Sequence, residues 1–329
     1  MLRSVRIGRV ERTLLAFTTA VILAGCSGAS PATPGPQQPQ SLIRQANRER
    51  PAEKKSGPIL FVADQGAKPV AAAVYAFADG GKFPQLWKLS GAPLASPQGL
   101  YVDGQTNLYV ADASGAVFEY DAPSGSEQPG APNLTYADTG YAPIAVAVCG
   151  DYVYAANSTG PGGGGSITVW QKGTSQPLRV TTNPAYAQGT GTGIACAGDK
   201  VYFYWWASYA GPGQIDRYAA GATGMPATLD FPSSQLFGGF TLDAAATEEV
   251  SGAIFSTFPA GKLIRALQAK WIEYPVGFAY EPGDKVLWDA DPEIGALNRF
   301  TPKGKLLGQI TKPASGTFGA LSGVAVSPR

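Results

Sequence analysis

The sequence predicts an all-β protein built as a six-bladed β-propeller. Three observations support this prediction: a composition rich in turn residues, an apolar strand motif that recurs six times, and two chain segments that complement each other. The 329 residues include 42 glycines and 27 prolines, and only 15% are charged. Such a composition disfavours long helices and is typical of many short strands joined by tight turns.

The repeat begins with a short apolar strand that follows a small residue. Its copies start at residues 99, 145, 193, 239, 277 and 323. A second strand follows each of the first five copies, as in "NLYVAD" (Asn107–Asp112), with a poor match at "EEVSG" near residue 248. A third strand then ends on an aromatic residue, such as Tyr120. A period in the forties with several strands per unit is typical of propeller blades.

The beginning and end of the repeat region complement each other. "ILFVAD" (Ile59–Asp64) is a second-type strand with no first-type strand before it, and "GVAVS" at residue 323 is a first-type strand with no second after it. We expect the C-terminal strand to join the N-terminal blade and close the ring, which removes exposed sheet edges. An open sandwich of the same strands is the alternative.

The first 25 residues have the pattern of a secretory leader. Four arginines precede an apolar run from Leu14 to Ala24, which is too short to span a bilayer as a helix. The following "LAGC" (residues 23–26) resembles the bacterial lipobox. This resemblance implies cleavage before Cys26 and attachment of lipid to Cys26. A buried helix that ends in an ordinary cysteine is the alternative.

Three regions follow from this pattern: a lipoprotein signal peptide (1–25), a lipid-anchored disordered tether rich in proline and glutamine (26–57), and the propeller (58–329). We expect a bacterial envelope location outside the cytoplasm, at the outer membrane where two membranes are present. Residues 59–329 carry 16 basic and 21 acidic residues, so no basic face for nucleic acid is expected. The expected partners of this monomer are the membrane, through the lipid on Cys26, and an unknown envelope protein or glycan.

A family resemblance supports the fold. The stretch "GLYVDGQTNLYVADASGAVFEY" (residues 99–120) resembles the repeats of NHL-repeat proteins, and a looser likeness extends over residues 59–329. The resemblance implies a propeller, but repeats of this kind do not specify a function.

The sequence contains no histidine, which limits the chemistry available. Ser-His-Asp and Cys-His catalysis, histidine zinc sites and histidine-ligated haem are excluded. A non-catalytic scaffold that binds a ligand or a protein, without a cofactor, is therefore the first hypothesis. The alternative is a metal-dependent hydrolase, because the layout also resembles the gluconolactonase type of six-bladed enzyme.

That second resemblance implies a divalent cation held by a Glu, an Asn and an Asp in the channel. The nearest candidates here are Asp64, Asn157 and Asp291, and no glutamate in the first blade is obviously placed for the role. The competing interpretation is that these side chains cap tight turns by binding backbone N–H groups.

Two further groups are candidate functional residues. Trp205, Trp206 and Tyr209 lie where other repeats carry the turn carboxylate, so they either bind a sugar or a protein partner or pack between blades. Cys149 and Cys196 lie in the first strands of neighbouring blades. Either they form a disulfide, which an exported compartment permits, or they are buried free thiols.

Overall fold

The computed structural model describes residues 57–327, except for 79–81, 122–125, 162, 207–212, 231–238, 244–247, 251–252, 257–261, 268–273, 282 and 284–285. All of these residues belong to one compact unit, Glu53–Arg329. Among them, no helix is long and apolar enough to cross a bilayer.

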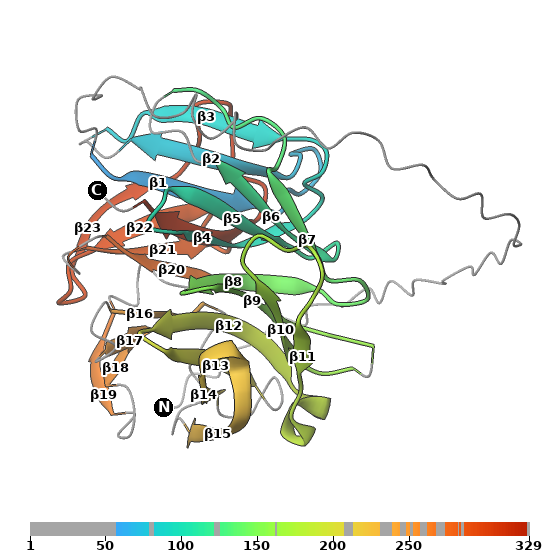
Figure 1. Ribbon diagram of the computed structural model, residues 1–329. Helices are drawn as coiled ribbons and strands as arrows, with labels where there is room; N and C mark the ends of the chain where they lie inside the picture. The colour runs from blue at the N-terminus through green and yellow to red at the C-terminus, as the bar shows by residue number, and fades with distance from the viewer. Residues whose placement is uncertain are drawn as a thin grey trace, which may run out of the picture. The chain divides into compact units, whose positions relative to one another are not determined.

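The described residues form an all-β propeller of antiparallel sheets, which confirms the predicted propeller but not the predicted number of six blades (Figure 1). The first sheet contains β24 (Leu321–Val326), β1 (Ile59–Asp64), β2 (Ala73–Ala78) and β3 (Gln85–Ser90). The second contains β4 (Pro97–Val102), β5 (Asn107–Asp112), β6 (Ala116–Asp121) and β7 (Leu134–Ala137). The third contains β8 (Pro143–Cys149), β9 (Tyr152–Asn157), β10 (Ser166–Gln171) and β11 (Arg179–Thr181).

The fourth sheet contains β12 (Thr190–Ala197), β13 (Lys200–Trp206), β14 (Gly213–Ala219) and β15 (Thr223–Asp230). The fifth contains β16 (Thr241–Leu242), β17 (Glu248–Val250), β18 (Ala253–Ser256) and β19 (Leu263–Ala266). The sixth contains β20 (Gly277–Tyr280), β21 (Leu287–Asp291), β22 (Ala296–Phe300) and β23 (Leu306–Ile310). Two 3-10 turns, η1 (Pro184–Gln188) and η2 (Ala220–Ala222), accompany them. Five sheets are full blades, with strands of three to eight residues, whereas the sheet β16–β19 is rudimentary, with strands of two to four.

The last described strand pairs with the first. β24 runs antiparallel to β1, with Val326 opposite Leu60 and Gly323 opposite Ala63. In Figure 1 the red strands of the last sheet accordingly lie beside the blue β1, and their side chains share one core cluster with it. The predicted closure by the C-terminal strand is therefore confirmed.

The strands are apolar on both faces because each sheet lies between two others. In β5, Leu108 and Val110 pack toward the preceding sheet, and Tyr109 and Ala111 pack toward the following one. Successive side chains of a strand point to opposite faces, so one short strand contributes to two cores. This explains why the repeats contain nearly continuous apolar runs.

Glycines let the innermost strands approach each other closely around the central axis. A Cβ added at Gly99 would lie 2.5 Å from the Cα of Ala145 in the next sheet, and one at Gly193 would lie 2.5 Å from the Cβ of Phe240. These glycines are the small residues that open the repeat in the sequence. We call the set at this level the glycine waist; it comprises Gly99, Gly193, Gly239, Gly277 and Gly323, with Ala145 in the third sheet.

We expect the change Gly277→Ala to destabilise the domain by about 1–3 kcal/mol, because the neighbouring backbone has no room for a methyl group. Its Cβ would lie 2.8 Å from the Cα of Gly323. Gly308→Ala is the matched control, since a Cβ there meets nothing within 4 Å; it is expected to be neutral or slightly stabilising. Urea unfolding midpoints compare the two, and equal shifts would contradict the role of the waist.

Candidate functional site

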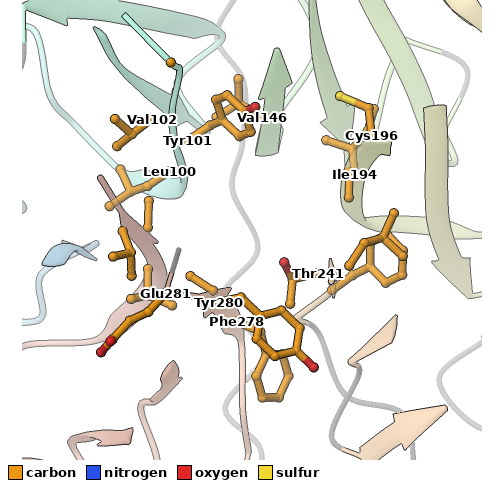
Figure 2. A pocket seen from close by; sticks show the side chains of 18 of the residues that line it. Leu100, Tyr101, Val102, Val146, Ile194, Cys196, Thr241, Phe278, Tyr280 and Glu281 are labelled. Carbon is orange, nitrogen blue, oxygen red and sulfur yellow. The ribbon is translucent and has the colours of Figure 1, made fainter. Parts of the chain in front are cut away.

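An apolar funnel opens at one end of the central axis and ends at the glycine waist. It has a volume of about 440 Å³ and is lined by the ends of the innermost strands (Figure 2). At the waist the space narrows to about 50 Å³. The apolar side chains of the wall include Leu100, Val102, Val146, Ile194, Phe278 and Val324. The funnel is therefore widest at its mouth and narrows to the waist.

The carboxylate of Glu281, which lies at the rim, is turned away from this space. Figure 2 shows the Glu281 carboxylate directed outward, and its Oε1 accepts hydrogen bonds from Trp288 Nε1 at 2.9 Å and Arg299 Nη2 at 3.0 Å. Only 6% of the Glu281 side chain is exposed. Both partners belong to the same blade, so the rim glutamate is already bound within the protein.

Asp103 follows β4 as Glu281 follows β20, and it is bound in a similar way. Its Oδ2 lies 2.7 Å from Lys172 Nζ of the next sheet. Burial alone would raise the pKa of Asp103, but the hydrogen bonds from Lys172 and from the Asn107 backbone outweigh it, and the pKa is lowered. Asp103 is therefore a carboxylate that joins two blades at the rim.

Two of the candidate metal ligands, Asp64 and Asp291, bind backbone N–H groups of their own blades. Asp64 accepts from Gly66 at 2.9 Å and from Gly319 at 2.7 Å, and Asp291 accepts from Tyr274 and Glu293, both at 3.0 Å. In each case the carboxylate caps its own turn and also binds the loop that leads into the first strand. Asp112 repeats the pattern, accepting from the backbone N–H groups of residues 95, 96 and 114.

Asn157, the third candidate, is fully buried and donates to Ser166 Oγ at 3.1 Å and to Thr168 Oγ1 at 2.9 Å. The structure thus places the three candidates in separate sheets, each engaged within its own sheet or the loop next to it. In the ranges that the structure describes, no three carboxylate or cysteine side chains gather closely enough to hold a metal ion.

The aromatic candidates divide between the core and the surface. Trp205 is only 3% exposed, and its ring centroid lies 4.8 Å from that of Tyr186, so its side chain packs in the core cluster between the third and fourth sheets. Trp206 is partly exposed and donates from Nε1 to Tyr204 Oη at 2.7 Å. Tyr209 lies outside the described residues.

Cys149 and Cys196 form a disulfide between β8 and β12, with their Cα atoms 6.2 Å apart. Cys196 also lines the funnel. The bond therefore ties together two innermost strands of the funnel wall.

A buried polar cluster between the second and third sheets was not predicted from the sequence. Asp138 is only 1% exposed, and its Oδ1 accepts from Thr168 Oγ1 at 2.8 Å. Burial raises the pKa of Asp138 to about 6, although hydrogen bonds from Thr168 and Asn157 oppose the rise. Asp138 is separated from Thr168 by 30 residues, and no local motif links the two.

Comparisons with known proteins place the chain by fold alone. No family model matches it, and no curated protein matches it. Among solved structures, one of a nidogen/laminin complex has a TM-score of 0.61 at 16% identity, covering 82% of this chain and 98% of that one. A putative 6-phosphogluconolactonase from Bacteroides fragilis NCTC 9343 has a TM-score of 0.53 at 14% identity, covering 84% and 99%. Both likenesses support the propeller fold.

We expect Asp138 to make stability depend on pH. Its pKa is raised from 3.8 in the unfolded chain to about 6, so the folded state binds the proton more tightly. The resulting stabilisation is complete below pH 4 and is lost as the pH rises through 6. Asp138→Asn should remove this dependence and raise stability at pH 7.5 by about 3 kcal/mol.

Urea unfolding at pH 5, 6 and 7.5 measures the effect. Asp151→Asn, which changes an exposed turn carboxylate, is the control. If both variants keep the pH dependence of the parent chain, Asp138 is not its source.

Proposed function

We propose that this chain is a non-catalytic binding protein that takes an apolar group of a ligand or partner into the funnel. One observation supports this above all: the larger part of the funnel wall is apolar, with Tyr101, Thr241 and Tyr280 among its polar groups, while Glu281 and the neighbouring Asp103 are bound to protein side chains. Apolar concave sites with few polar groups are the usual form of a binding pocket. A funnel that narrows toward the waist suits the end of an elongated molecule or a projecting side chain.

We infer that the rudimentary sheet β16–β19 serves as a sixth blade of an NHL-like ring. Its innermost strand contacts β12 on one side and β20 on the other. A Cβ at Gly239 would lie 2.8 Å from the backbone nitrogen of Gly277, so this strand also takes part in the glycine waist.

The gluconolactonase-type alternative finds no support in the geometry. Asp64 and Asp291, which it requires as metal ligands, already accept hydrogen bonds from backbone N–H groups. The likeness to a putative 6-phosphogluconolactonase lies at 14% identity and speaks for the fold alone.

The proposed setting is a lipid anchor at Cys26 on a bacterial envelope membrane. The described chain enters the domain at Gly57, and the backbone N–H of Ile59 donates to Ser327 Oγ at 2.8 Å. Ser327 follows Val326, which lines the funnel. The chain therefore enters the propeller beside the funnel mouth.

Narrowing the funnel should weaken the binding of an apolar probe. We expect Val102→Trp, at the partly buried rim, to lower the affinity for anilinonaphthalene sulfonate about tenfold, which corresponds to 1.4 kcal/mol. Probe fluorescence, titrated against the purified chain, measures the affinity.

Leu178→Trp is the matched control, because Leu178 is 49% exposed and does not line the funnel. It should leave probe binding unchanged. Equal affinities for the parent chain and Val102→Trp would overturn the funnel as the binding site. This result does not depend on whether Cys26 carries a lipid.

Lipid attachment is tested independently at Cys26. In bacteria fed radiolabelled palmitate, the parent chain should carry the label and separate with membranes, whereas Cys26→Ser should carry none. The two remaining cysteines, Cys149 and Cys196, are paired with each other. Label that persists in Cys26→Ser would contradict the assignment.

A further inference from the structure

A second cavity lies outside the funnel, along the outer edge of the last sheet. It has a volume of about 530 Å³ and follows residues 307–312, the end of β23 and the turn after it. Its other wall is formed by Lys82 and Phe83, which precede β3, and by Arg299 of β22. We call it the β23 groove.

Gly308 leaves the groove open, although nothing in the fold requires a glycine there. Unlike the glycines of the waist, it faces empty space, since a Cβ would meet no atom within 4 Å. It is also absent from the residues with positive φ. Gly308 is paired with Arg299, so the missing side chain leaves the space above the guanidinium uncovered. Glycine inside a strand weakens it and often marks the close approach of a ligand or another backbone.

Phe83 has an unusual backbone conformation at the other wall. Its φ is 44°, in the left-handed region that bulky residues avoid. Its ring lies 5.2 Å from that of Trp288, and the Arg299 guanidinium lies 5.4 Å from the Phe83 ring and 5.6 Å from that of Trp288. Such strain persists only where the surroundings enforce it, and it is concentrated at functional sites.

The groove is positively charged. Arg299 is fixed by Glu281 at 3.0 Å, which holds the guanidinium in place and balances its charge. Lys82 and Lys312 are exposed at the rim, and the described lining residues include no carboxylate. The net positive charge of the groove therefore comes from Lys82 and Lys312, because the charge of Arg299 is balanced by Glu281.

The strand that borders the groove has one open side. β23 pairs with β22, and no other described strand pairs with it. Leu307 is 50% exposed on it. An open strand edge presents alternating N–H and C=O groups, which another extended chain satisfies by adding a strand.

We propose that the β23 groove binds an extended acidic peptide segment of another protein, which adds a strand to the edge of β23 and places its carboxylates against Lys82 and Lys312. A lipid headgroup or a small anion would pair with the charges of the lysines but would form no hydrogen bonds with the open backbone edge of β23. The absent side chain at Gly308 leaves room beside this edge for a side chain of the added strand.

The test uses the purified full chain and a labelled peptide of five Thr-Glu repeats. Fluorescence anisotropy should show binding that weakens with added salt, and hydrogen exchange should slow at residues 306–310. Lys312→Glu should weaken binding about fivefold. Gly308→Val, which fills the space above Arg299, should weaken it at least as much.

The controls keep charge and size matched. Lys303→Glu changes an exposed lysine outside the groove, and Gly130→Val adds a side chain at another open glycine; both should bind like the parent chain. The proposal is overturned if a Thr-Gln peptide binds equally well, or if the Glu peptide does not bind. It is also overturned if inorganic phosphate produces the same slowing of exchange, or if the chain binds phosphatidylglycerol vesicles and not the peptide.

Discussion

The close approach of the innermost strands at the glycine waist is the constraint on which the rest of the structure depends. At Gly99, Gly277 and Gly323 a single methyl group would collide with the backbone of the next sheet. Because the strands meet there, each sheet is enclosed by its neighbours, and its side chains are buried on both faces. The same contact narrows the axis to a space of about 50 Å³ at the inner end of the funnel.

The polar residues near the axis serve mainly to hold this arrangement. Asp64, Asp112 and Asp291 bind the loops that lead into the innermost strands, while Asp103 and Glu281 bind side chains outside the funnel. Buried carboxylates of this kind need hydrogen bonds that replace the water they have lost. With these groups bound within the protein, the larger part of the surface that remains at the channel mouth is apolar.

Much of the fold could be predicted because short, local sequence patterns determine the strands and the repeat. The strand Asn107–Asp112 is observed with the predicted bounds, and the small residue that opens each repeat, a glycine in five of them and Ala145 in the third sheet, lies at the waist. The site was harder to predict because its decisive contacts are not local. The outward turn of Glu281 depends on Arg299, and the burial of Trp205 depends on Tyr186. Gly308 looked like any other glycine, and only the empty space around it distinguishes it from Gly277.

The pairing of β24 with β1 has a consequence for how the chain is made. The two strands are joined by hydrogen bonds between residues more than 250 positions apart, such as Ala320 and Asp64 beside the pair. Until β24 has been synthesised, β1 lacks its inner neighbour, and an edge that is paired in the folded domain stays open. Such edges are sites of aggregation. A chain of this design therefore exposes an aggregation-prone strand edge until its final strand is in place.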